Sequence, residues 1–299
     1  MAINLTTFAK NLTYQADTSV SKIFKDFKEL EEIKQLGEEK VAYFTILAGW
    51  GYLGTVLVVF GWAWALSNNL SNWTNFTIFL LAIVIASSIF CTVKWSYYHK
   101  LKLRDDRHEL PKKILSMVNR DRTPNSNVKI LIHFTPVGKL GKKIQTIPHA
   151  RKRGWKIDIF EDKWLTLQGE FIDSTDFLLT ATEFNTRAYG WQTNNNNKSK
   201  WKSKDKLKGT EINLKLSFPR KKYGSIHIIQ QAAPEAVKLP TGVQLKRMKV
   251  TSKAIDLTVQ FYGNYGTEHL YKTITMMFLS LYQVLNFAKI LSRKRQILS

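Results

Sequence analysis

Residues 41–66 read VAYFTILAGWGYLGTVLVVFGWAWAL, a run of 26 residues without a charge. A helix of about 20 apolar residues is long enough to cross the hydrocarbon layer of a bilayer. A second uncharged run, FTIFLLAIVIASSIFCTV, occupies residues 76–93, and the nine residues between the two runs are mostly polar. This pattern predicts a transmembrane hairpin with spans at about 41–66 and 76–93. The alternative is a pair of helices buried in a soluble core.

The basic residues beside the hairpin predict its orientation. Lys34 and Lys40 precede the first span, five Lys and Arg residues lie between 94 and 107, and the connecting loop contains neither residue type. Loops rich in Lys and Arg stay on the cytoplasmic side of a membrane. The sequence therefore predicts a multi-pass integral membrane protein with both termini in the cytoplasm.

Most of the net charge lies beyond the hairpin. The 299-residue chain has 45 Lys and Arg against 23 Asp and Glu, a net charge of +22. Residues 1–100 account for +1 of it and residues 101–299 for +21. With 44% hydrophobic and 12% aromatic residues, the composition supports a packed core and excludes acidic disordered and collagen-like chains. The single cysteine, Cys91, excludes an intramolecular disulfide.

The hydropathy pattern divides the chain into four segments. Residues 1–40 are predicted to contain a cytoplasmic amphipathic helix, which packs on the cytoplasmic domain, pairs with another subunit or lies on the membrane. Residues 41–98 form the hairpin. Residues 99–127 are a basic juxtamembrane linker with a helix that begins near Pro111. Residues 128–299 form a basic, β-rich cytoplasmic domain.

The β-rich prediction rests on a change of hydrophobic period from 3.6 to 2 after residue 127. Glu161 and Asp162 are predicted to form a hairpin turn. No long helical pattern interrupts this region, which favours an antiparallel sandwich or small barrel and an α+β fold overall. The predicted strands lie at 128–134, 155–160, 163–168, 175–187, 211–218, 225–230 and 253–262.

A set of basic residues is predicted to bind a polyanion. Six of them are lysines at every second position, so that an extended strand would present them on one face, roughly 7 Å apart. Anionic lipid headgroups or nucleic-acid phosphates would suit this spacing, whereas the alternative is a solvated, Lys-rich loop or edge. Trp201 and Leu207 would then face the other way and anchor the strand to the core. The set comprises Lys198, Lys200, Lys202, Lys204, Lys206, Lys208, Arg151, Lys152, Arg153, Arg220, Lys221 and Lys222.

The last predicted element is a helix at residues 267–294 that closes the domain. Apolar residues recur along it with alternating spacings of four and three, which is typical of a coiled-coil seam between subunits. The rest of its circumference is also largely apolar, so it packs over the sheet or forms a third span. The seam residues are Leu270, Ile274, Met277, Leu281, Val284, Ala288 and Leu291.

No sequence motif indicates catalysis, and the six histidines show no paired metal-binding spacing. The sequence predicts neither a metal site nor a cofactor. The leading hypothesis is a non-catalytic membrane protein whose basic cytoplasmic domain binds anionic lipid or another polyanion, in binding or assembly at the bilayer. The alternatives are an oligomeric two-span pore or membrane effector and a membrane-tethered nucleic-acid-binding protein. A homo-oligomer is compatible with each of them.

Overall fold

The computed structural model describes residues 5–68, 71–123, 126–136, 138, 140–193, 198–224, 226–263 and 265–298. These residues form two compact units. The first unit comprises residues 5–11 and 26–103, and the second comprises residues 12–25 and 104–298.

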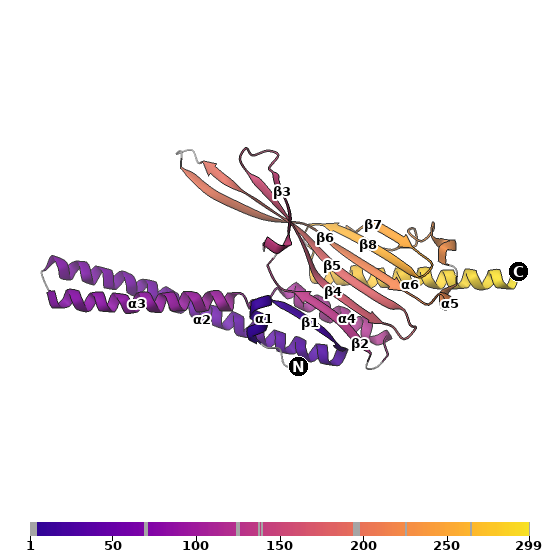
Figure 1. Cartoon of the computed structure of the whole chain (residues 1–299), viewed down its shortest axis with the longest axis horizontal. Helices are drawn as coiled ribbons and strands as arrows, with labels where there is room; N and C mark the ends of the chain where they lie inside the picture. Colours follow the sequence, from indigo (N-terminus) through magenta and orange to yellow (C-terminus); the bar gives the residue numbers. More distant parts are fainter. Residues whose placement is uncertain are drawn as a thin grey trace. The chain divides into compact units, whose positions relative to one another are not determined.

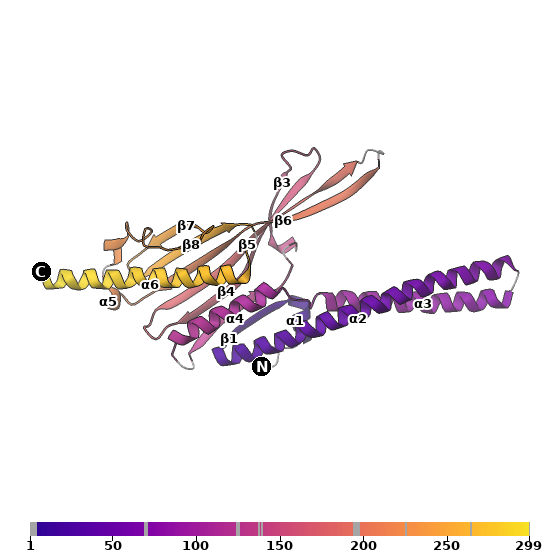
Figure 2. The same ribbon diagram turned by 180° about the vertical axis from the view of Figure 1, so that it is seen from behind.

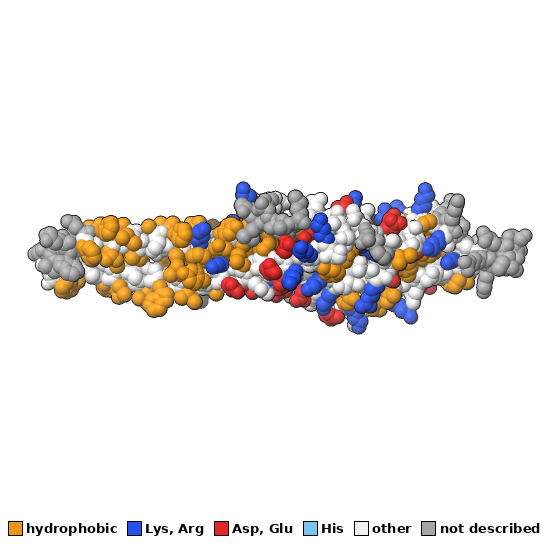
Figure 3. Space-filling view, turned by 90° about the horizontal axis from the view of Figure 1, so that it is seen from below, with side chains coloured by type: hydrophobic (Ala, Val, Ile, Leu, Met, Phe, Trp, Pro, Cys, Tyr) orange, Lys and Arg blue, Asp and Glu red, His pale blue; other side chains and the backbone are white. Residues whose placement is uncertain are grey.

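The first unit is built from long apolar helices. It contains α1 (Leu5–Asn11), most of α2 (Val20–Ser67) and α3 (Ser71–His99). The indole of Trp95 donates a hydrogen bond to the Thr45 hydroxyl across 3.0 Å, which ties α3 to α2. At Gly51 a Cβ would lie only 2.9 Å from Ser88 Oγ, so the two helices approach closely there. Large apolar side chains cover the outside of this helix pair (Figure 3).

The helices α2 and α3 contain the two predicted apolar runs, so the prediction that these runs are helical is confirmed. By length and composition, three helices in the described part of the chain could cross a membrane: Val20–Trp64, Phe76–His99 and Thr267–Ser292. The amphipathic helix predicted within residues 1–40 runs without a break into the first apolar run as α2. It begins at Val20, because the preceding residues, Thr13–Ser19, form strand β1.

The second unit contains one eight-stranded sheet in which every neighbouring pair is antiparallel (Figure 1). The strand order is β1-β2-β4-β5-β6-β8-β7, and β3 pairs with β4 beside this path. Since β1 and β7 end the sheet without pairing with each other, the sheet is open, and neither the predicted sandwich nor the predicted barrel is confirmed. The further strands are β2 (Asn127–His133), β3 (Lys143–Pro148), β4 (Lys156–Glu170), β5 (Asp176–Thr193), β6 (Ser199–Ser217), β7 (Gln244–Val250) and β8 (Ala254–Tyr262).

Two helices, α4 (Asp105–Val118) and α6 (Thr267–Leu298), cover the same face of the sheet (Figure 2). Alternate strand residues such as Leu179, Leu214 and Leu257 are fully buried on this face. Leu214 and Leu257 have polar neighbours on both sides in their strands, as expected for a sheet with one covered face. The α+β fold with an antiparallel sheet is therefore confirmed. Short helical turns complete the unit: η1 (Asn119–Asp121), η2 (Leu140–Lys142), α5 (Arg220–Tyr223) and η3 (Ile226–Ile229).

Three local predictions were wrong. Glu161 and Asp162 do not form a turn, because β4 runs through them and directs the Asp162 carboxylate into a buried charge network. The strand predicted at 225–230 is not formed by its described residues, since Ile226–Ile229 form the turn η3. Pro111 lies inside α4, which begins at Asp105, where two acidic residues suit the positive end of the helix.

Strands β3 to β6 continue beyond the helix-covered part of the sheet (Figure 1). The register shifts between Lys163 and Leu165 in β4, and Lys208 is an extra residue in β6 opposite β5. Such bulges bend and twist a strand. We call the part beyond them, residues 143–160 and 185–208, the basic lobe. Of these, residues 194–197 lie outside the described residues.

Gly209 directly follows the β6 bulge and is expected to be intolerant of a side chain. A Cβ at this position would lie 2.4 Å from the carbonyl oxygen of Phe261 in β8, and a backbone atom in a paired strand has little freedom to move. Gly209→Ala should lower the free energy of unfolding by about 1–3 kcal/mol, the usual range for overpacking. Chemical denaturation of the full chain in detergent measures this.

Gly141→Ala is the matched control, since no atom lies within 4 Å of the added methyl group. An equal, small effect of both substitutions would contradict a tight contact at the base of the lobe.

Candidate functional site

The basic lobe carries charges that the rest of the chain does not neutralise. Its sequence contains 12 Lys and Arg residues and only two acids, Asp158 and Asp205. Lys143 lies 2.8 Å from Asp158, and Arg187 lies 2.7 Å from Asp205. Among the described residues, the other ten cations form no ion pair: Arg151, Lys152, Arg153, Lys156, Lys198, Lys200, Lys202, Lys204, Lys206 and Lys208.

Both acids of the lobe are held in the charged form. The guanidinium of Arg187 lowers the pKa of Asp205, and Asp205 in turn raises the pKa of Arg187. Burial acts to raise the pKa of Asp158, but the bonds that it accepts from Lys143 and Thr146 lower it below its ordinary value. At neutral pH the lobe therefore has a net charge of +10 from these residues.

The alternating lysines lie on an ordered strand, as the extended prediction requires. Lys200, Lys202, Lys204 and Lys206 are exposed in β6, where they pair with Gln192, Gly190, Ala188 and Thr186 of β5. Alternate residues of a regularly paired strand lie on one face of the sheet, so these four lysines point the same way. Lys198 precedes the strand and Lys208 is the bulged residue, so we leave both out of this row.

Trp155 joins one basic triplet to this lysine row. Its ring lies against Gly190, where a Cβ would come within 2.6 Å of it, and its indole donates a hydrogen bond to the Trp191 carbonyl at 2.9 Å. Lys152 Nζ lies 4.0 Å from the centroid of the same ring. Since Gly190 is paired with Lys202, the triplet at 151–153 and the lysine row lie on the same lobe.

The prediction that Trp201 anchors the strand to the core was wrong. Trp201 is 50% exposed and Trp191 is 63% exposed, because both lie on the part of the hairpin that extends beyond the helices. Their ring centroids are 5.5 Å apart in an edge-to-face arrangement, and Tyr189 lies 5.6 Å from Trp201. These three residues form an exposed aromatic cluster. Sequence analysis missed it, although Tyr189 and Trp191 have the same strand parity.

Three cations on the polar face of the sheet body have acidic partners. Lys129 pairs with Asp17 at 3.6 Å, and Lys246 pairs with Glu211. Arg247 lies 3.4 Å from Asp256. Lys163, Lys215 and Lys249 of the sheet body form no ion pair among the described residues either, but the lobe concentrates ten such cations.

The second triplet is not part of the lobe. Residues 220–222 lie in α5, just beyond Ser217, the end of β6 that is remote from the lysine row. Lys222 donates a hydrogen bond to the Asp173 carbonyl at 3.0 Å. The side chains of Arg220 and Lys221 lie outside the described part of the chain.

The predicted seam of the last helix is covered by the chain itself. Six of its residues are buried, from Leu270 to Ala288, and Leu291 is half-buried. The helix α6 packs against α4 and β6. The structure thus shows the packing over the sheet, and a seam between subunits would require α6 to leave it.

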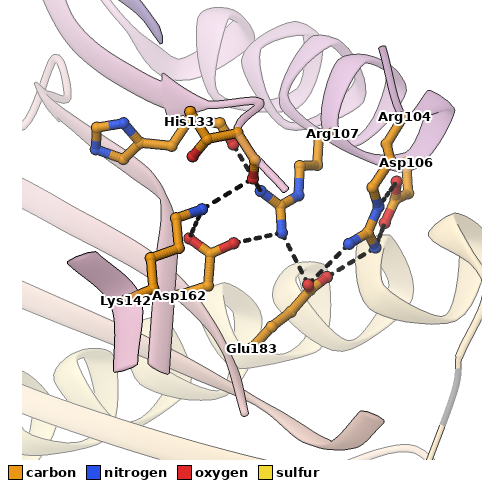
Figure 4. A network of polar contacts seen from close by, with 8 residues as sticks. Arg104, Asp106, Arg107, His133, Lys142, Asp162 and Glu183 are labelled. Atoms are coloured by element: carbon orange, nitrogen blue, oxygen red, sulfur yellow. Dashed lines mark hydrogen bonds and ion pairs between the residues drawn. The ribbon is translucent and has the colours of Figure 1, made fainter. Parts of the chain in front are cut away.

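A buried charge network lies at the base of the lobe (Figure 4). Arg107 of α4 is fully buried and donates hydrogen bonds to Asp162 at 2.7 Å and to Glu183 at 2.8 Å. Its guanidinium also bonds the His133 carbonyl at 2.7 Å. Lys142 lies 2.7 Å from Asp162, and Arg104 donates to both oxygens of Glu183 at 2.9 Å.

The surroundings shift the pKa values of three residues of this network, His133, Lys142 and Arg104. Burial lowers the pKa of His133, and nearby Lys142 adds to the effect, so that His133 is neutral at neutral pH. Burial also lowers the pKa of Lys142, despite its bond to Asp162. In Arg104 the opposing contribution of burial is overcome by hydrogen bonds to Asp106 and Glu183, which raise its pKa. Both buried carboxylates have guanidinium partners, so the network is suited to holding β4, β5 and α4 together.

Comparison of the chain with models of known families, with curated proteins and with solved structures finds no match. The site is thus described by its geometry. In the described part of the chain, no group of three or more His, Cys, Asp or Glu side chains is placed to hold a metal ion.

Proposed function

We propose that the chain is a non-catalytic integral membrane protein whose basic lobe binds anionic lipid headgroups at the cytoplasmic surface. The observation that carries the proposal is the group of ten unpaired, mostly clustered cations on a lobe that extends beyond the folded body. An unpaired cluster of this kind repels itself, which costs stability unless an anionic partner is present.

Membrane anchoring supports lipid as the polyanion. In the proposal, α2 and α3 cross the bilayer, both termini are cytoplasmic, and α6 stays on the sheet. Only residues 100–104 separate α3 from α4, so the second unit is tethered to the end of a span. Near an anionic leaflet, each Lys or Arg contributes about 1 kcal/mol of attraction.

Nucleic-acid binding is the second candidate, because the aromatic cluster of Tyr189, Trp191 and Trp201 provides rings for base stacking. Such binding combines a basic groove with stacking rings along one strand of nucleic acid. In β6 the lysines and Trp201 have opposite parity and therefore point to opposite faces. This arrangement favours lipid over nucleic acid. The structure offers no similar observation in favour of an oligomeric pore, because the predicted seam residues of α6 are already buried within the chain.

Lysine acetylation of the full chain in nanodiscs tests the proposal. We expect anionic lipid to protect Lys200, Lys202, Lys204 and Lys206 several-fold relative to neutral lipid. Lys215 on the same strand is the internal control, because it is exposed but lies in the body of the sheet. The protection should disappear in about 1 M salt, where the screening length is only about 3 Å.

Equal labelling of the four lysines in neutral and anionic nanodiscs would contradict lipid binding. Protection that requires an added single-stranded oligonucleotide, and does not depend on lipid charge, would favour the second candidate.

A further inference from the structure

The outer half of the β5–β6 hairpin has two chemically different faces. One face carries Lys200, Lys202, Lys204 and Lys206, and Lys152 is held nearby by Trp155. The other face carries Trp201 in β6 and, in β5, Tyr189 and Trp191. Trp191 is the direct partner of Trp201, and Tyr189 is the partner of Ser203, so the three rings share this face.

The aromatic face is a local feature of the outer hairpin. Nearer the base, the same face carries the Arg187–Asp205 ion pair and Lys156, the direct partner of Tyr189 in β4. Tyr189 directs its hydroxyl toward Asp158 at 3.3 Å. The rings therefore lie between the polar base of the lobe and the hairpin end. The two indoles retain large exposed surfaces after packing against each other.

We propose that the outer hairpin lies in the bilayer interface with Tyr189, Trp191 and Trp201 toward the hydrocarbon and the lysine row toward the phosphates. This inference rests on the proposed function and adds an orientation and an apolar contact to it. An amphipathic helix binds a membrane surface in the same manner, with Lys on its outer face and aromatic residues on its inner face. The hairpin is the β-strand counterpart.

Each side chain suits its place in this arrangement. Indole and phenol rings favour the interface, where the apolar body is shielded and the N–H or O–H group remains wet. Lysine extends its ammonium group outward along a flexible stem and reaches phosphates from a partly immersed strand. The opposite placement, with the lysine face against the membrane, would satisfy the charges and leave two tryptophans in water.

Nucleic acid fits the two faces less well than a bilayer interface does. A base and the phosphate of the same nucleotide would have to reach opposite sides of one sheet layer. A bilayer interface presents hydrocarbon and phosphate at different depths, in the order in which the hairpin presents rings and cations.

Spin labels on the two faces test the orientation in the full chain. The only cysteine is Cys91, so a Cys91→Ala background accepts one label at a chosen site. Ser203→Cys places the label on the aromatic face and Gln192→Cys places it on the lysine face, and neither removes a ring or a cation. In nanodiscs with anionic lipid, the label at residue 203 should be more accessible to oxygen, and less to a water-soluble nickel chelate, than the label at residue 192.

The outcomes separate the inference from the proposed function. A deeper label at residue 203 supports the inference. A deeper label at residue 192 overturns the inference and leaves lipid binding by the lysine row intact. Two labels that stay in water at every lipid composition overturn both. Immobilisation of the label at residue 203 by a single-stranded oligonucleotide, without bilayer, also overturns the inference.

Removal of the rings provides a second measurement. Trp191→Ala with Trp201→Ala should reduce the oxygen accessibility of the label at residue 203 several-fold. Anionic lipid should still protect the lysine row from acetylation at low salt, which shows that the lobe is folded and attached. An unchanged depth at residue 203 in this variant would overturn the role of the rings.

Discussion

Arg107→Met is expected to destabilise the full chain by about 3–5 kcal/mol, the cost of removing one partner from a buried ion pair. The substitution leaves the carboxylates of Asp162 and Glu183, which are 1% and 6% exposed, without their shared guanidinium. Lys142 and Arg104 remain near them but contact one carboxylate each. Methionine fills much of the volume, so the loss reports uncompensated charge more than a cavity.

Arg247→Met is the matched control. Arg247 pairs with Asp256 at 3.4 Å on the exposed face of the sheet, where an ion pair contributes less than about 1 kcal/mol. Chemical denaturation of both variants in detergent compares the two sites. Equal losses of stability would show that the network at the base of the lobe behaves as a surface pair and does not hold the strands together.

Partial neutralisation of the carboxylates should recover stability in the Arg107→Met background. Without Arg107, Arg104 and Lys142 face three carboxylates, those of Asp106, Asp162 and Glu183. Glu183→Gln removes the excess negative charge while it keeps the side-chain shape, so the double variant should be more stable than Arg107→Met alone. A stabilising effect of Glu183→Gln in this background, at a residue that contacts Arg107 in the native chain, would show that the two sites are coupled. A further loss of stability in the double variant would assign the effect of Arg107→Met to packing.

The sequence predicted the features that depend on local pattern. Uncharged runs are long enough to identify α2 and α3, and alternation identified the central strands. The strands β1, β3 and β7 were not predicted. In β1 (Thr13–Ser19) and β7 (Gln244–Val250) polar residues are mixed with apolar ones, and these segments become strands by pairing with other strands of the sheet. Strand identity at such edges is set by tertiary context.

The candidate site was predicted only in part, because some of its features depend on local pattern and others on tertiary context. Alternation alone placed the lysines on one face, and the structure agrees for the four from Lys200 to Lys206. The alternation pattern could not show that Trp191 is paired with Trp201, because this pairing depends on strand register. For the same reason it could not show that the ring of Trp155, beside Lys152, lies against Gly190. The buried network was missed because Arg107 lies 55 residues from Asp162 and 76 from Glu183.

Replacement of the four-lysine row by glutamine is expected to weaken binding to anionic membranes roughly a thousandfold. The variant is Lys200→Gln, Lys202→Gln, Lys204→Gln and Lys206→Gln, and each lysine near an anionic surface contributes about 1 kcal/mol. The sum of about 4 kcal/mol corresponds to roughly three factors of ten. Full chain in immobilised neutral nanodiscs, exposed to vesicles that contain phosphatidylserine, gives the apparent affinity as a function of lipid concentration.

A control with the same change in net charge decides whether the row acts as a site. Lys129→Gln, Lys163→Gln, Lys215→Gln and Lys249→Gln also remove four exposed lysines, but from the body of the sheet. If general attraction by a +22 chain explained binding, both variants would lose affinity alike. A loss confined to the row would follow from its concentration of four cations on one face of a single strand, whereas the four control lysines are spread over β2, β4, β6 and β7.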